Sequence, residues 1–141
     1  MKVYHLPHRA TFIVVRNSAS LYYVQRRSLT KDYCPGYLEP MAGGVVGVGE
    51  DCDDSARREL EEEMGIRDTS ISHVATFSYS SPPMLTWRSL YECVYDGPVT
   101  MQEEEVSEVL LMSADEILQR QNEMTPDGIF AFLTYLKSKS Q

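Results

Sequence analysis

Three glutamates stand close together in the run ELEEEM, at positions 59, 62 and 63. On a helix, spacings of three and four residues place these side chains on one face, about a turn apart. Like charges at this spacing repel each other, so the arrangement favours a bound cation. Hard divalent cations such as Mg2+ take oxygen ligands, usually a few carboxylates together with waters and substrate phosphates. For such a cluster taken alone, the alternative is a solvated acidic helix face.

The residues around this segment predict a loop before the helix and a stop after it. Asp51 or Asp53 fits the N-cap position, and Gly65 stands where a helix ends in a left-handed residue. Arg58 is expected to hold Glu50 or another acid of the loop, which would fix the loop onto the helix. Four glycines allow a tight turn and a close approach of the backbone to a ligand. They are Gly43, Gly44, Gly47 and Gly49.

From Gly44 to Ile66 the chain fits the pattern G, five residues, E, seven residues, R-E-U-x-E-E-x-G-U, where U is a bulky apolar residue. All seven fixed identities and both apolar positions are present, and by this pattern the sequence resembles the Nudix family. The resemblance implies an α/β/α sandwich with a mixed β-sheet, in one domain over residues 1–141. It also implies structural roles for Glu50, Arg58 and Gly65.

The same resemblance implies a hydrolase that depends on Mg2+ or Mn2+. Its substrate would be the diphosphate linkage of a nucleoside diphosphate derivative or a related pyrophosphate compound. Glu59, Glu62 and Glu63 would hold the metal, which neutralises charge and activates a water. By the same resemblance, the general base is expected to be Glu62 or Glu63, or a glutamate of a later loop. Candidates in that loop are Glu103, Glu104 and Glu105, for which a solvated loop is the alternative.

Two basic residues and several aromatic residues are candidates for contacts with the substrate. Arg27 and Lys31 fit a clamp on an outer phosphate or acid group, although basic side chains also serve solubility. Gly43 and Gly44 would let the backbone approach the substrate. Three aromatic side chains could stack on a base, but a core position is the default for aromatic residues on strands. These are Tyr37, Phe77 and Trp87.

A closer group is indicated by the segments HRATFIVV, QRRSLTKDYCPGYLE and EEEVSEVLLMSADEI. They resemble the Nudix hydrolases that are related to isopentenyl-diphosphate isomerase. The isomerase uses a Cys and a His just after the PG loop, where this chain has Ala42 and Gly44, and of its metal-binding histidines only His8 can be placed. Without the Cys no group is evident for proton transfer at carbon, so the sequence argues against isomerisation. The group usually has a further N-terminal strand region, so a short or truncated version is expected here.

A binding or sensing module without catalysis is the alternative from another class. Loss of the glutamates of the pattern would indicate it, and none is lost. Charge excludes other classes, since the 141 residues carry a net charge of −8, and 12 of the 21 acidic residues lie in 50–63 and 103–108. This balance argues against general binding of nucleic acid or membranes. The resemblance to the Nudix family implies a small diphosphate compound as partner. A homodimer is common among Nudix proteins.

Three cysteines without a CxxC pair indicate reduced thiols, and no leader or membrane span is visible. The sequence therefore predicts a cytoplasmic protein. The predicted strands are residues 10–16, 21–27, 38–46, 71–79, 86–95 and 106–112. The predicted helices are residues 53–64, a short helix from a Ser113–Glu116 capping box to residue 120, and a last helix from Pro126 to about Lys137.

Overall fold

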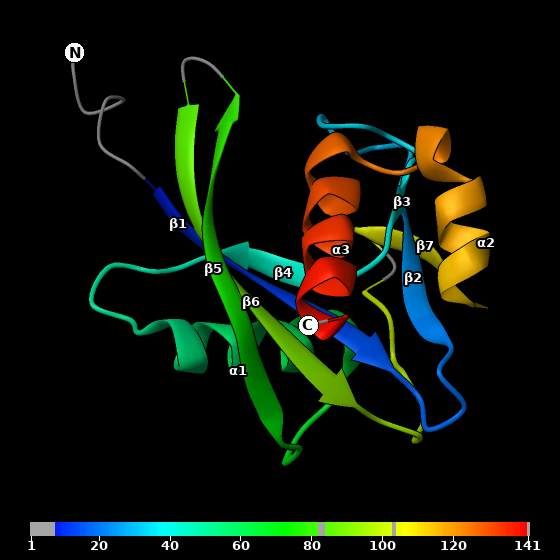
Figure 1. The fold of residues 1–141 in the computed structure, drawn as a ribbon, viewed down its shortest axis with the longest axis horizontal. Coiled ribbons are helices and arrows are strands. Elements are labelled where there is room, and N and C mark those ends of the chain that lie inside the picture. Colours follow the sequence, from blue (N-terminus) through cyan, green and yellow to red (C-terminus); the bar gives the residue numbers. More distant parts are fainter. Residues whose placement is uncertain (1–7, 82–83, 103, 141) are drawn as a thin grey trace.

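Seven strands form one mixed sheet in the computed structural model, which describes residues 8–81, 84–102 and 104–140 (Figure 1). The strands are β1 (His8–Arg16), β2 (Tyr22–Arg27), β3 (Leu38–Glu39), β4 (Ala42–Val45), β5 (Ile71–Ser81), β6 (Met84–Val94) and β7 (Val106–Met112). The helices are α1 (Cys52–Met64), α2 (Ala114–Gln119) and α3 (Pro126–Lys139), with a 3-10 turn at Gln121–Glu123.

Strand β1 is the central element of the sheet. It pairs in parallel with β6 along its whole length, from His8 opposite Thr86 to Arg16 opposite Val94. On its other side it pairs antiparallel with β4, and at its end with β2. Strand β2 continues the sheet to β3 and β7, and β5 lies antiparallel to β6 at the opposite edge. Parallel and antiparallel pairs therefore coexist, which confirms the predicted mixed sheet.

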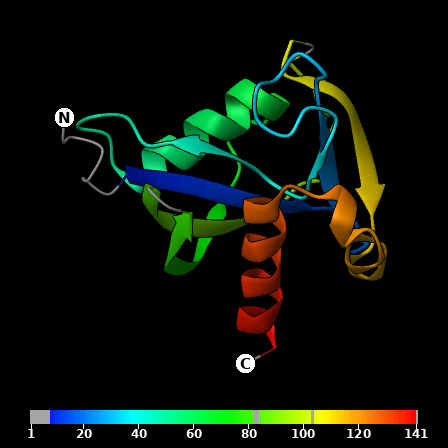
Figure 2. The same ribbon diagram turned by 90° about the horizontal axis from the view of Figure 1, so that it is seen from above.

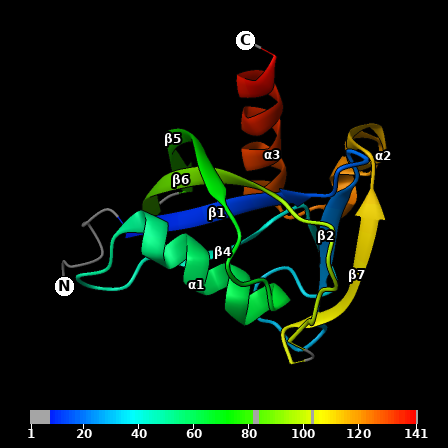
Figure 3. The same ribbon diagram turned by 90° about the horizontal axis from the view of Figure 1, so that it is seen from below.

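Helices α1 and α3 lie on opposite faces of this sheet (Figures 2 and 3). The alternation of side chains along β1 divides the core between the two faces. Phe12 and Val14 belong to the cluster under α3, whereas Ile13 and Val15 belong to the cluster under α1. The predicted α/β/α sandwich is therefore confirmed.

Several predicted elements differ from the observed ones. The predicted strand 38–46 is two short strands, β3 and β4, because Pro40 offers no backbone N–H for a continuous ladder and the two pieces pair with different strands. The hairpin of β5 and β6 is longer than predicted, and α3 continues two residues further, to Lys139. The capping box of Ser113 and Glu116 is present as predicted.

Candidate active site

Helix α1 is fixed at both ends by the capping residues that the sequence predicts. The side chain of Asp51 accepts a hydrogen bond from the backbone N–H of Asp54 at 2.8 Å. Gly65 ends the helix with φ of 68°, a region that favours glycine. Between the caps, Leu60 and Met64 are buried against the sheet. This packing sets the rotation of the helix and so decides which glutamates face the sheet.

Glu59 is buried between α1 and β4 and is 8% exposed. It fits there because its neighbour on β4 is Gly44, where a Cβ atom would lie 2.6 Å from the Glu59 carboxylate. At Gly43 a Cβ atom would lie 2.1 Å from the backbone oxygen of Thr11 on β1. The sequence predicts that these two glycines leave room for a ligand. In the structure, α1 and β1 fill much of that room.

Glu63, one turn further along α1, points toward the same strands. Its Oε1 accepts hydrogen bonds from Gln25 Nε2 at 3.1 Å and from the backbone N–H of Gly43 at 3.4 Å. Burial raises the pKa of Glu63 to about 9; the bond from Gln25 opposes this shift and the neighbouring Glu59 adds to it. The carboxyl group of Glu63 therefore favours its protonated form more than an exposed glutamate does.

Glu62 does not join this pair. Its carboxylate is half exposed and accepts a hydrogen bond from Arg58 Nη1 at 3.2 Å. Within the described part of the chain, no three Asp, Glu, His or Cys side chains converge as a set of metal ligands. The physical reason is that three carboxylates repel each other in the absence of a cation, and Arg58, four residues earlier on the helix, attracts the most exposed of them. A metal-binding role for Glu62 stays a prediction.

Arg58 joins α1 to the preceding loop. Its Nε and Nη2 atoms donate to the two carboxylate oxygens of Glu50 at 2.9 and 3.0 Å, and its Nη1 donates to Glu59 at 2.9 Å. Arg58, and next the backbone N–H of Gly47, lower the pKa of Glu50 to about 2. The contact between Arg58 and Glu50 is the one expected from the sequence. Through its Nη1 atom, Arg58 also orients the buried carboxylate of Glu59.

A cavity of about 240 Å³ opens between α1, β2, β4 and the segment before β7. Its wall carries four glutamates and two basic residues, and each basic residue forms an ion pair with one of the glutamates. Arg27 Nη1 lies 2.5 Å from Glu39 Oε1, and Lys31 Nζ lies 3.2 Å from Glu105 Oε2. The lining residues are Gln25, Arg27, Lys31, Glu39, Gly43, Gly44, Glu59, Glu63, Glu105 and Val106.

Most of the candidates from the sequence meet at this cavity. The expected substrate residues Arg27, Lys31, Gly43 and Gly44 all line it, as do three of the expected glutamates, Glu59, Glu63 and Glu105. Glu62 lies outside, Glu104 is exposed and does not line it, and Glu103 falls outside the described residues. The three aromatic candidates are absent from its wall; Phe77, for example, packs against Phe130.

Two polar residues of the cavity, Gln25 and Glu39, were not predicted. Gln25 is 3% exposed and donates to Glu63, and burial raises the pKa of Glu39 although Arg27 opposes this shift. The sequence does contain a signal for Gln25. Tyr23, Gln25 and Arg27 lie on the same face of β2, and a polar residue that faces inward needs a hydrogen-bond partner. Glu39 carries no comparable local signal.

The chemistry of the donors fits a divalent cation. Glu59 is buried and Glu63 is partly buried, and desolvation together with the negative charge of Glu59 raises the pKa of Glu63, so negative charge is disfavoured at this pair. A divalent cation would balance the negative charge of both groups, because carboxylates are its usual ligands. Basic groups on the same wall would hold an anion beside such a cation.

Comparison with known proteins gives the class of the molecule. The NUDIX domain family matches residues 6–133, and the chain belongs to this family. The protein is therefore a Nudix pyrophosphohydrolase, and Nudix hydrolases generally use divalent metals. It is similar to the Nudix hydrolase YfcD of Escherichia coli K12, with 41% identity over 141 residues that cover 100% of this chain and 78% of the relative.

Solved structures share the fold. The MutT protein from Methanosarcina mazei Go1 superposes with a TM-score of 0.80 at 19% identity, over 96% of this chain and 97% of that one. The NUDIX domain of Shewanella oneidensis NrtR, in complex with ADP ribose, gives 0.78 at 14% identity, over 99% and 92%. In the described part of the chain, no helix has the length and apolar character needed to cross a membrane.

Proposed function

We propose that this protein hydrolyses a diphosphate linkage in a nucleoside diphosphate derivative or related compound, with Mg2+ or Mn2+ held by Glu59 and Glu63. The observation that carries the proposal is the cavity whose wall brings the carboxylates of Glu59 and Glu63 together with Arg27 and Lys31. A diphosphate needs cations on both sides of its charge, and the wall offers a cation site and two basic groups. The ADP ribose bound to the similar NUDIX domain of NrtR supports a nucleotide derivative as substrate.

In this proposal, the basic residues of the cavity bind the substrate and the glutamates support its hydrolysis. Arg27 and Lys31 release Glu39 and Glu105 and bind the outer phosphate, because phosphate oxygens compete for the same N–H donors. An ion held by Glu59 and Glu63 would supply a water of lowered pKa and would neutralise charge on the diphosphate. In the hydrolysis, a water adds to one phosphorus and gives its proton to a glutamate, the bridging P–O bond breaks, and the two phosphorylated products leave.

The general base that takes the proton of the water is proposed among Glu62, Glu63, Glu103 and Glu105. Glu105 has geometry in its favour, since its carboxylate lines the cavity and becomes free once Lys31 turns to the substrate. Glu62 is half exposed on the far side of Arg58, and Glu63 is held by Gln25 and Gly43.

Kinship with the isopentenyl-diphosphate-isomerase-like Nudix hydrolases belongs to the proposal as well. At the two positions matched to the isomerase's Cys and His, Ala42 is buried under α1, and Gly44 leaves its space to Glu59. Neither residue has a group that can carry a proton, which supports hydrolysis over isomerisation. We further propose that residues 1–141 form one domain; a homodimer stays a prediction.

The test measures product release from a panel of diphosphate compounds with Mg2+ or Mn2+. Glu59→Gln and Glu63→Gln should lower turnover by at least about 100-fold. Mutation of residues that only hydrogen-bond to metal ligands already costs about 10–100-fold in metal affinity or activity, and loss of a ligand should cost more. Glu61→Gln is the matched control, because Glu61 lies on the same helix but pairs with Arg67 at the surface. Equal losses in all three variants would contradict the assignment. Metal-dependent binding of a compound without turnover would instead indicate a sensing module.

A further inference from the structure

A second cavity, of about 430 Å³, lies on the α3 side of the sheet. Gly44 borders both cavities, so they meet at β4, which pairs on one side only with β1 among the described strands. The second cavity is lined by Ala10, Phe12, Gly44, Val45, Thr86, Arg88 and Asp127. A compound whose diphosphate lies beside Glu59 therefore has a second space within reach across Gly44.

The two cavities differ in chemistry. The first carries charged side chains on most of its wall, whereas the second offers the apolar surfaces of Ala10, Phe12 and Val45. Its one cation, Arg88, is neutralised by Asp127, with 3.0 Å between Nη1 and Oδ2. A diphosphate has little to gain there. An uncharged group with an apolar surface has much to gain, because it leaves water on entering.

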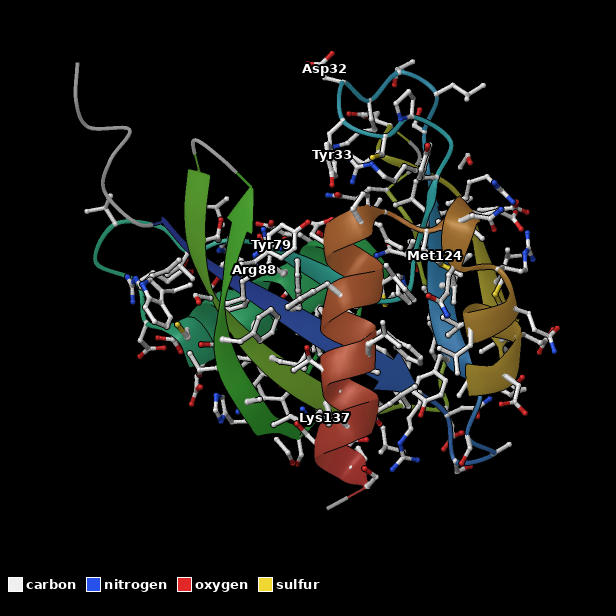
Figure 4. The ribbon with its side chains drawn as sticks, turned by 45° about the horizontal axis from the view of Figure 1, so that its top comes forward. Asp32, Tyr33, Tyr79, Arg88, Met124 and Lys137 are labelled. Carbon is white, nitrogen blue, oxygen red and sulfur yellow. The ribbon has the colours of Figure 1, made fainter. Side chains whose placement is uncertain are left out.

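Arg88 is held rigidly at this cavity. It is 9% exposed, and its guanidinium carbon lies 4.9 Å from the ring centroid of Phe12 and 4.7 Å from that of Tyr79. Figure 4 shows Arg88 and Tyr79 close together on the sheet beside α3. The Nε donor of Arg88 is buried without a hydrogen-bond partner among the described residues. Such donors are rare in folded proteins, and an acceptor on a ligand would supply the missing partner.

Asp127 connects this cavity to the first one through the loop before β3. Its Oδ1 accepts a hydrogen bond from the hydroxyl of Tyr33 at 3.1 Å. The backbone oxygen of Tyr33 in turn accepts from Arg27 Nε at 2.8 Å. Tyr33 is seen above the first turn of α3 in Figure 4. The residue that neutralises Arg88 thus also supports the loop that holds Arg27.

We propose that the second cavity binds the group attached to the diphosphate, and that Arg88 and Asp127 determine which groups are accepted. The group is flat, has an apolar surface and carries a hydrogen-bond acceptor for Arg88, as a nucleobase does. Aliphatic chains such as an isopentenyl group fit the apolar wall but leave Arg88 without its acceptor. This inference rests on the proposed function, since it places the diphosphate beside Glu59 and Glu63.

Calorimetric titration with non-hydrolysable probes and Mg2+ separates the two cavities. The probes are methylenediphosphonate, its adenosine ester and its isopentenyl ester. Wild type should bind the adenosine ester more tightly than the other two. Arg88→Met should weaken binding of the adenosine ester by about 10–100-fold, the value of a hydrogen bond to a charged group. Binding of methylenediphosphonate should change by less than about twofold, within the tolerance for independent sites.

Two further variants distinguish a specific effect on the second cavity from a general loss of folding. Val45 is 65% exposed at the edge of the second cavity, so Val45→Trp should fill the cavity without disturbing the core and should also weaken the adenosine ester selectively. Arg120→Met removes another ion-paired arginine, at the end of α2 and outside both cavities, and should change none of the three affinities.

Four results would overturn the inference. If the adenosine group adds no affinity in wild type, or if Arg88→Met and Val45→Trp leave its contribution intact, the second cavity has no such role and the proposed hydrolysis still stands. If the isopentenyl ester binds as tightly as the adenosine ester, Arg88 does not select the group. If methylenediphosphonate itself fails to bind wild type with Mg2+, the proposed function fails together with the inference.

Discussion

At the scale of single residues, the adjacent glycines Gly43 and Gly44 are required for different reasons. A Cβ atom on Gly43 would meet backbone, 2.1 Å from the oxygen of Thr11, whereas a Cβ atom on Gly44 would meet only the end of the Glu59 side chain. Backbone of a central strand cannot move aside, but a carboxylate can. The first glycine therefore serves the sheet and the second serves the site.

We accordingly expect two different outcomes from Gly43→Ala and Gly44→Ala. Gly43→Ala should lower the free energy of unfolding by about 3 kcal/mol, the upper range for overpacking. Gly44→Ala should stay folded but displace Glu59 and lower kcat/KM. Chemical denaturation and steady-state kinetics on both variants check this. Loss of stability in Gly44→Ala as large as in Gly43→Ala would contradict the distinction.

At the scale of secondary-structure elements, the sequence predicted local features well and long-range ones poorly. The caps of α1 at Asp51 and Gly65 depend on residues a few positions apart, so the pattern of the chain specifies them. Glu39 enters the site only because β3 pairs with β2 and brings it opposite Gln25. The orientation of Glu62 depends on a competition for Arg58 that spacing alone does not decide.

A partly buried carboxylate, that of Glu92 on β6, joins β6 to α3. Glu92 accepts hydrogen bonds from Arg16 at 3.0 Å, from Lys139 at 3.1 Å and from the hydroxyl of Tyr135. Burial alone would raise the pKa of Glu92, but these donors outweigh it, and the pKa lies below its ordinary value of 4.5. A lowered pKa means that the charged form stabilises the fold above pH 4.5, and that this contribution is lost as the pH falls through the folded-state pKa.

Glu92→Gln should therefore lower the free energy of unfolding at pH 7 by about 2 kcal/mol, as expected for hydrogen bonds to a charged group. The difference from wild type should shrink as the pH is lowered below 4.5. Denaturation curves at a series of pH values measure it. The control is Glu108→Gln, whose carboxylate is 47% exposed in its pair with Arg26 and should cost less than about 1 kcal/mol. A difference that grows on acidification would refute the assigned sign.

At the scale of the whole molecule, both faces of the sheet depend on the same strand. Phe12 and Val14 of β1 pack in the cluster under α3, and Ile13 and Val15 pack in the cluster under α1. Neither cluster can open without loosening β1, and β1 in turn pairs with β6 along its whole length. The helix that carries Glu59 and Glu63 is therefore expected to unfold together with α3, although the two helices lie on opposite faces (Figure 3).

Matched core truncations test this cooperativity. Leu60 under α1 and Phe132 under α3 are fully buried, so Leu60→Ala and Phe132→Ala should each lower the free energy of unfolding by about 3–4 kcal/mol. Each variant should show one midpoint that is the same for helix content, by circular dichroism, and for the fluorescence of Trp87 on β6. An early loss of helix signal in Leu60→Ala, with the Trp87 transition unshifted, would show that α1 unfolds separately. The metal-binding carboxylates would then stand on an element with its own stability, and cation binding would stabilise α1 alone rather than the whole chain.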